Sequence, residues 1–390
     1  MEIMTNFNRI MITWICYLSY AFVGALIIVN GIIMESISKY FKLPILKIST
    51  SFTFLNLGIL ISIFLNFWLI KIISFKKQFV VNFFSILLII IFLINNHNIK
   101  LFSFCMFILG IIAGTTISNC TFLIINLYEF KKRGYYLMIT DSFFSLSGIL
   151  FPIISINILK QNICWYWIYF IINIIYLLIV ILTINVTFPI IKIDNYNKLK
   201  INKIFKIDTL LLSISAMFYI FAQLTFISWV PQYMNKYLNL NIMYSGKLIS
   251  NFWFYYMCGI WVFSLLSKYI TLQKIFIFMT GISTIFMFCF IKSTILLYLN
   301  LNIIGLGFFS SGIYMIIITI ASLNNKINNF NNINIILTFG TIGTMLTFII
   351  SNFIIEKISL YSSLIMSNIL YFIVFILSIL SYFIKLYKNY

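Results

Sequence analysis

The feature that most restricts this sequence is a succession of long apolar runs, each about long enough to cross a lipid bilayer. An α-helix rises 1.5 Å per residue, so crossing the hydrocarbon core takes roughly 20 apolar residues. The runs do not alternate polar and apolar residues, as membrane β-strands do. We therefore predict an all-α membrane protein with about twelve transmembrane helices. The expected spans are residues 10–33, 50–70, 79–95, 101–127, 137–159, 165–187, 209–233, 247–267, 274–291, 294–321, 333–355 and 361–385.

The composition supports a lipid environment. Hydrophobic residues make up 63% of the 390 residues and charged residues only 8%, which is too little polar surface for a soluble protein of this length. The formal net charge of +19 raises the possibility of a nucleic-acid partner. However, the basic residues are scattered singly between the apolar runs. We therefore expect no nucleic acid and take the lipid bilayer as the partner of the outer surface.

The lysines and arginines predict the orientation, because cytoplasmic loops of membrane proteins carry an excess of both. With the N-terminus inside, the cytoplasmic segments hold 17 of the 26 basic residues. The longest polar stretch, residues 188–208, carries five lysines. We predict a six-helix bundle at residues 1–187, a cytoplasmic linker at 188–208 and a second six-helix bundle at 209–390. Both termini are expected in the cytoplasm, and the first run is too long for a signal peptide.

A weak internal repeat supports two similar halves, which are common among transporter folds. The loop after the second span recurs after the eighth at an offset of 197 residues, and two glycines recur near an offset of 195. The matches are Lys71 with Lys268, Ser74 with Thr271, Lys77 with Lys274, Gly110 with Gly305, and Gly148 with Gly343. Small residues such as Gly110, Gly114, Gly305, Gly307 and Gly343 are expected to permit close helix packing.

Six segments resemble the TsgA family, a bacterial branch of the major facilitator superfamily. They are SFTFLNLGILISIFLNFWLIKI (51–72), RGYYLMITDSFFSLSGILFP (133–152), QLTFISWVPQY (223–233), SNFWFYYMCGIWVFS (250–264), LGFFSSGIYMIIITIAS (306–322) and LTFGTIGTMLTFI (337–349). The sequence is also similar to the fucose-permease group of sugar–proton symporters. The resemblance covers nearly the whole chain. It implies a major-facilitator fold of twelve helices in a bacterial inner membrane, and it supplies no substrate.

Two departures limit what the resemblance implies. The superfamily's loop between helices 2 and 3 has the pattern Gly-x-x-x-Asp-Arg-x-Gly-Arg, whose carboxylate and arginines latch the cytoplasmic gate. The equivalent segment here, NFWLIKIISFKK (66–77), keeps only basic residues, so such a latch is weaker or built differently. Fucose-permease-like carriers also place carboxylates mid-membrane in helices 1 and 4. Here Asn30 and Asn119 stand near those depths, which argues against proton symport by that family's route.

Among the seven acidic residues, Asp141 is the one expected within a span. The other acidic residues fall in expected loops or at span ends, where solvation is the simplest interpretation; Glu35 and Lys39 lie one helical turn apart. Asp141 is expected near the cytoplasmic end of the fifth span, where a carboxylate is costly unless it is paired or hydrated. One hypothesis is that it pairs with a lysine or arginine and closes the inner gate. The alternative is a carboxylate at headgroup level without such a role.

No catalytic, metal or nucleotide site is visible. The six cysteines lack CxxC spacing and are interpreted as small buried hydrophobic residues. The single histidine, His97, lies in a polar loop and is interpreted as solvated. A phosphate-binding GxxxxGK[ST] motif and paired carboxylates for acid–base chemistry are both absent from the sequence. We therefore expect neither an enzyme nor an ATP-driven pump, and no cofactor or metal.

In a carrier of the fold implied by the resemblance, the solute cavity lies among helices 1, 4, 7 and 10, with 2, 5, 8 and 11 contributing. Polar and aromatic residues on those spans are the substrate-binding candidates, because a buried amide without partners is costly. The candidates are Tyr20, Asn30, Asn119, Gln223, Trp229, Asn251, Tyr255, Tyr314 and Thr341. The competing interpretation is hydrogen bonding between helices, worth about 0.6 kcal/mol each.

These residues favour a secondary-active or facilitative transporter of a small polar solute. A cavity of amides, hydroxyls and aromatic rings without a fixed charge suits a neutral solute such as a sugar. The alternative is a transport-fold sensor or partner-binding scaffold without flux. Such a sensor normally has a long cytoplasmic domain, whereas the longest loop expected here is residues 188–208. The expected form is a monomer, and the direction of transport and any coupling to protons stay open.

Overall fold

The protein is a bundle of long helices in the computed structural model, which describes residues 5–95, 97–189, 207–240, 242–267, 269–323 and 329–389. No strand occurs in these ranges. The first half contains α1 (Asn6–Ile28), α2 (Asn30–Phe41), α3 (Ile45–Ile72), α4 (Phe75–Asn95), α5 (Ile99–Leu127), α6 (Phe130–Lys160) and α7 (Tyr166–Ile184). The second contains α8 (Ile207–Leu238), α9 (Ile242–Leu266), α10 (Leu272–Lys292), α11 (Leu296–Ser310), α12 (Ile313–Leu323), α13 (Asn329–Lys357) and α14 (Leu360–Asn389).

Twelve spans in the described ranges are long and apolar enough to cross a membrane, which confirms the expected number. Each corresponds to one predicted run, with α11 and α12 together forming the tenth. The sixth and seventh spans are α7 and α8. Most of the linker predicted at 188–208 lies outside the described residues. Large apolar side chains such as Trp68, Phe84 and Phe353 are exposed on the outside of the bundle, as lipid contact requires.

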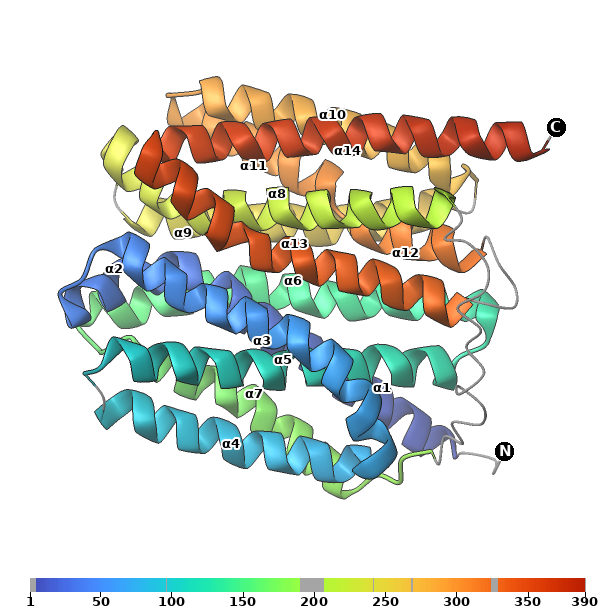
Figure 1. Ribbon diagram of the computed structural model, residues 1–390, viewed down its shortest axis with the longest axis horizontal. Helices are drawn as coiled ribbons and strands as arrows, with labels where there is room; N and C mark the ends of the chain where they lie inside the picture. The colour runs from blue at the N-terminus through green and yellow to red at the C-terminus, as the bar shows by residue number, and fades with distance from the viewer. Residues whose placement is uncertain are drawn as a thin grey trace.

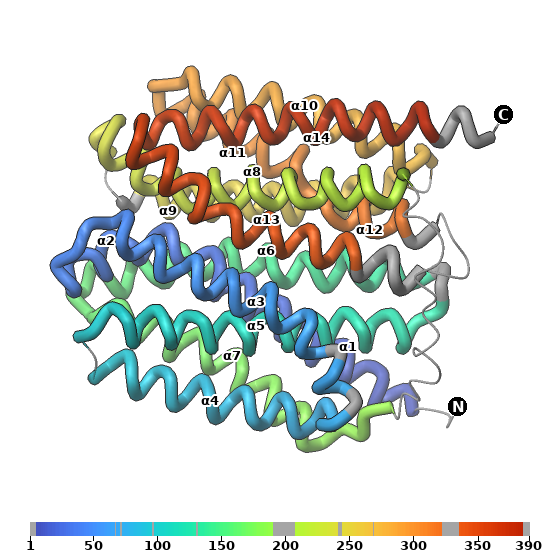
Figure 2. The backbone as a smooth tube through the Cα atoms, in the orientation of Figure 1, coloured from blue at the N-terminus to red at the C-terminus, as the bar shows by residue number. Residues whose placement is uncertain are grey.

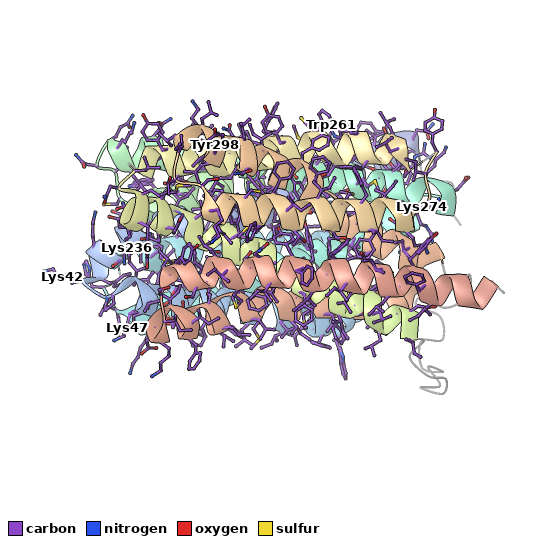
Figure 3. The ribbon with its side chains drawn as sticks, turned by 90° about the horizontal axis from the view of Figure 1, so that it is seen from above. Lys42, Lys47, Lys236, Trp261, Lys274 and Tyr298 are labelled. Atoms are coloured by element: carbon purple, nitrogen blue, oxygen red, sulfur yellow. The ribbon has the colours of Figure 1, made fainter. Side chains whose placement is uncertain are left out.

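The helices run along one common direction, and the two ends of the chain lie at the same end of the bundle (Figure 1). We call this the terminal end and the opposite one the distal end. Figure 3 places Lys42, Lys47 and Lys236 at the distal end and Lys274 toward the terminal end. This is the segregation expected from the lysine pattern. That the terminal end faces the cytoplasm stays a prediction.

Two spans differ from their predicted form. The helix of the fifth span, α6, begins at Phe130 rather than at residue 137, so Asp141 lies farther inside its helix than expected. The tenth span is broken between α11 and α12, as the backbone trace shows (Figure 2). At the break Gly312 has a φ of 68°, in the left-handed region that glycine adopts without the steric cost of a Cβ atom.

The internal repeat is visible in where the helices begin. The starts of α3 and α9, Ile45 and Ile242, are 197 residues apart. The same offset separates the starts of α4 and α10 and the starts of α5 and α11. Helix packing repeats as well: α3 packs on α5 as α9 packs on α11, and α1 packs on α6 and α7 as α8 packs on α13 and α14. The two halves are therefore built on one plan.

The glycines show the repeat at the level of single contacts. A Cβ atom on Gly110 would collide with the backbone carbonyl of Leu55, and one on Gly307 would collide with that of Phe252. Both pairs join equivalent helices, and their members are 197 residues apart. The structural counterpart of Gly110 is therefore Gly307, and the expected match with Gly305 is wrong. The prediction that these glycines permit close packing is confirmed, since a Cβ on any of the five would meet a neighbouring helix at short range.

Candidate functional site

A cavity of about 150 Å³ lies in the middle of the bundle. Residues of α1, α3, α5 and α6 line one side, and residues of α8, α9, α12 and α13 line the other. These are spans 1, 2, 4, 5, 7, 8, 10 and 11, the same eight that the family resemblance implies. Because each half contributes its equivalent four helices, the cavity lies on the interface between the two halves.

Four of the nine substrate-binding candidates line the cavity: Tyr20, Gln223, Tyr314 and Thr341. The Tyr20 hydroxyl shares a hydrogen bond of 2.8 Å with Thr121 Oγ1, and Thr341 Oγ1 donates to the Thr338 carbonyl at 2.8 Å. Gln223 is buried, and its Nε2 has no hydrogen-bond partner in the described part of the chain. Of these four, Gln223 therefore has an unused donor beside the cavity.

Asn119 lies away from the cavity, in a chain of amides inside the first half. Asn66 Nδ2 donates to Asn119 Oδ1 at 2.9 Å, and Asn119 Nδ2 donates to Gln78 Oε1 at 2.8 Å. Gln78 Nε2 in turn donates to the Ile73 carbonyl at 2.9 Å. The chain joins α5 to α3 and α4, so the described partners of Asn119 are neighbouring helices. This arrangement fits the hydrogen-bonding interpretation that the sequence left open.

The remaining four candidates also lie off the cavity wall. Trp229 is buried, and its Nε1 donates to Ser351 Oγ of α13 at 2.8 Å. Asn30 is buried beside the junction of α1 and α2. Asn251 and Tyr255 lie on a half-exposed side of α9.

The face of α9 that lines the cavity carries Trp253 and Tyr256 instead, which the sequence analysis missed. Both side chains are almost fully buried. The span is apolar around most of its circumference, so no period of 3.6 residues marks its inner face. One signal was available: Trp and Tyr combine large apolar bodies with a polar group that needs a partner when buried.

Asp141 lies on the cavity wall, not at the membrane surface. It is eleven residues from the start of α6 at Phe130, about 16 Å along the helix. A charged side chain at the centre of a transmembrane helix costs about 2.5–3.5 kcal/mol on insertion scales. The cavity wall therefore includes an ionisable carboxyl group, which the lining expected from the sequence did not contain.

The described partner of Asp141 is a tyrosine rather than a cation. The Tyr256 hydroxyl donates a hydrogen bond to the carboxylate, and the one ion pair found in the described ranges is elsewhere. A gate in which Asp141 pairs with a lysine or arginine would have to form in a different conformation of the protein. That gate stays a prediction.

The break in the tenth span is tied to this carboxylate through tyrosines. Tyr219 donates a hydrogen bond of 2.7 Å to the carbonyl of Ser310, the last residue of α11. The backbone N–H of Gly312 donates to the Tyr256 hydroxyl, which in turn reaches Asp141. Interrupted helices of this kind form binding sites in many transporters, because their ends present unpaired backbone groups.

On the distal side of the cavity the two halves are in contact. Asn56 Nδ2 of α3 donates to the Thr344 carbonyl of α13 at 2.7 Å. Nearer the distal end, Ser49 Oγ donates to Asn352 Oδ1 at 2.8 Å. Gly31 of α2 lies so close to α8 that a Cβ would be 2.8 Å from the Ser228 carbonyl.

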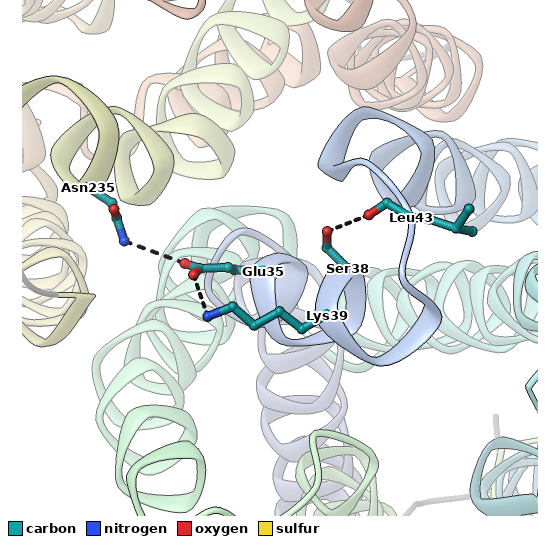
Figure 4. A network of polar contacts seen from close by, with 5 residues as sticks. All are labelled: Glu35, Ser38, Lys39, Leu43 and Asn235. Atoms are coloured by element: carbon teal, nitrogen blue, oxygen red, sulfur yellow. Dashed lines mark hydrogen bonds and ion pairs between the residues drawn. The ribbon is translucent and has the colours of Figure 1, made fainter.

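A polar network continues this contact at the distal end (Figure 4). Lys39 Nζ lies 2.8 Å from Glu35 Oε1, the pair expected from their spacing. Asn235 Nδ2 of α8 donates to the other oxygen of Glu35 at 3.5 Å. The network therefore links α2 of the first half to α8 of the second.

The cysteines differ partly from expectation. All six are free, and Cys16, Cys105 and Cys120 are buried, but Cys164 is exposed and the interpretation as a buried residue is wrong for it. Cys164 lies in the turn before α7 at the distal end, outside the helices that bury those three side chains. No group of three or more potential metal ligands occurs in the described ranges.

Comparisons with known proteins agree with the geometry. Residues 13–332 match the model of the Major Facilitator Superfamily. A protein described as "Protein TsgA homolog" from Buchnera aphidicola subsp. Acyrthosiphon pisum (strain Tuc7) is 53% identical over 386 residues, covering 99% of this chain and 100% of the relative. A protein of the same description from Yersinia pseudotuberculosis serotype O:1b is 45% identical over 385 residues, with 98% of each covered.

A solved structure has the same fold. It is the crystal structure of FucP, described as a major facilitator superfamily transporter in the outward conformation. The TM-score is 0.65 over 95% of this chain and 98% of the other, at 15% sequence identity.

Proposed function

This chain belongs to the major facilitator superfamily, and from that premise we propose that it carries a small polar solute across the bacterial inner membrane by alternating access. It is a multi-pass membrane transporter and not an enzyme. The observation that supports the proposed mechanism is the central cavity, because equivalent helices of both halves line it. A rocking motion of one half against the other would expose such a cavity to each side in turn.

The distal contacts between the halves support a barrier on that side of the cavity, and the halves also meet between α6 and α9, where Trp261 Nε1 donates to Ser142 Oγ at 3.2 Å. Distal to the cavity, α3 and α13 are joined by the hydrogen bonds from Asn56 and Ser49, and α2 and α8 by the pair of Asn235 and Glu35. If the terminal end faces the cytoplasm, this conformation is closed toward the outside. Transport would then require these distal contacts to break.

The proposed carrier works as a monomer, because both halves of the cavity come from one chain. The competing function is a sensor or scaffold without flux. Flux in proteoliposomes separates the two, since only a carrier moves solute.

The test is uptake of a panel of radiolabelled solutes, including L-fucose, D-glucose and choline, into liposomes that contain the purified protein. Protein-free liposomes are the control. Saturable uptake of one solute supports the carrier, and parallel assays with and without a pH gradient show whether protons are coupled. If the folded protein moves no solute above the protein-free rate, the carrier proposal fails in favour of the scaffold.

A further inference from the structure

The cavity wall carries one acidic side chain. Asp141 is the only Asp, Glu, Lys, Arg or His among the residues that line it, and the tyrosines there are neutral near pH 7. No lysine, arginine or histidine of the described chain lines it. A carboxylate in a low-dielectric site without a cationic partner is stabilised in its ionised form by a cation beside it. The wall is therefore electrostatically suited to a positive solute.

The other polar groups on the wall are largely occupied within the protein. The hydroxyls of Tyr20 and Thr121 bond to each other, and Thr341 and Thr344 donate to carbonyls of their own helix. A sugar needs many donors and acceptors directed toward its hydroxyls, because each hydroxyl left unpaired on burial is costly. A wall with one carboxyl group and two donors that have no described partner, Gln223 Nε2 and Trp253 Nε1, provides too few of them.

Aromatic side chains line the same cavity as the carboxyl group. Tyr20, Tyr219, Tyr256 and Tyr314 come from four different helices. Trp253 adds a fifth ring, whose centroid lies 5.0 Å from that of Tyr256. Aromatic rings attract cations through their quadrupoles, and cages of such rings are the usual receptor for quaternary ammonium groups.

We propose that the cavity binds a small organic monocation, a quaternary or primary ammonium compound, with its charge held by Asp141 and its alkyl groups against the tyrosine and tryptophan rings. This assignment rests on the proposed carrier function and specifies its solute class. The cavity of about 150 Å³ is below the usual range for drug-sized ligands, which limits the solute to a small one.

The test uses the full-length protein in detergent and measures binding of radiolabelled choline and tetraethylammonium by equilibrium dialysis. The competitor is 3,3-dimethyl-1-butanol, which has the shape of choline but a carbon atom in place of the charged nitrogen. On the unmodified protein, we expect the alcohol to bind roughly tenfold or more weakly than choline. If choline and the alcohol compete equally, or if neither cation binds saturably, the proposal is wrong.

Substitutions test whether Asp141 is the residue that binds the positive charge of the solute. Asp141→Asn should weaken binding of the cation roughly tenfold or more, and Asp141→Glu should restore part of it. Glu356→Gln is the matched control, because it removes the same charge from an exposed position at the end of α13, away from the cavity. If Asp141→Asn is folded and binds the cation as the unmodified protein does, Asp141 does not hold the charge.

Flux measurements keep this proposal separate from the carrier proposal. Flux of a neutral sugar without any binding of cations would overturn the cation assignment and leave the carrier intact. Saturable cation binding without flux of any solute would leave the cation site intact and overturn the carrier.

Discussion

Replacing Asn119 by leucine separates the two interpretations of the buried amides. If Asn119 binds solute, the substitution should weaken solute affinity with little effect on stability. The structure predicts the opposite, because the side chain bridges α5 to α3 and α4 through bonds of 2.9 and 2.8 Å and lies off the cavity wall.

The size of the effect follows from the bonds that are lost. Two interhelical hydrogen bonds are removed, at about 0.6 kcal/mol each and at most about 1.7 kcal/mol. The substitution also leaves Asn66 Nδ2 and Gln78 Oε1 buried without these partners. We therefore expect Asn119→Leu to lower the free energy of unfolding by about 1–3 kcal/mol.

The assay is reversible unfolding in mixed micelles, followed by tryptophan fluorescence, together with solute affinity on the folded protein. Ser118→Ala is the matched control, since Ser118 directly precedes Asn119 in α5 but lines the cavity. It should change stability by no more than about 0.5 kcal/mol. Unchanged stability of Asn119→Leu together with weakened solute affinity would refute the packing interpretation.

Three further predictions concern packing and orientation. Gly307→Ala should destabilise the second half by about 1–3 kcal/mol, because the new Cβ meets the Phe252 carbonyl; an unchanged unfolding free energy would contradict this contact. Gly312→Ala forces a Cβ into the left-handed region at the helix break and should cost about 1 kcal/mol, with a matching fall in the unfolding midpoint. In intact cells whose protein carries Cys164→Ser, which removes the exposed native thiol, an impermeant maleimide should label Lys236→Cys but reach Lys274→Cys only after permeabilisation; the reverse pattern would invert the predicted orientation.

The sequence was sufficient for the helices because span length and apolar content are properties of the chain itself. The repeat was visible at the loop pair of Lys77 and Lys274, since the starts of three helix pairs share its offset of 197 residues. The glycine match at Gly305 was wrong because glycines are frequent in such helices, and only the contact with Phe252 identifies Gly307 as the counterpart.

The cavity was only partly predictable. The resemblance indicated the right eight helices, but which face of α9 turns inward depends on packing between the halves, so Trp253 and Tyr256 were missed in favour of Asn251 and Tyr255. Asp141 was expected nearer the end of its helix because α6 begins at Phe130, earlier than the apolar run does.

In the proposed mechanism, solute crosses only when the two halves separate at the distal end. The direct test joins Ser49→Cys of α3 to Asn352→Cys of α13, whose side chains are in contact, with a short cross-linker that a reductant cleaves. Cys164→Ser removes the exposed native thiol.

The matched control is the pair Ser51→Cys and Ser103→Cys, which lies within the first half at a contact of 2.8 Å. Flux in proteoliposomes is measured before cross-linking, after it and after reduction. We expect the link between the halves to stop flux and reduction to restore it, whereas the control link should leave flux unchanged throughout. Undiminished flux through fully cross-linked protein would contradict the mechanism.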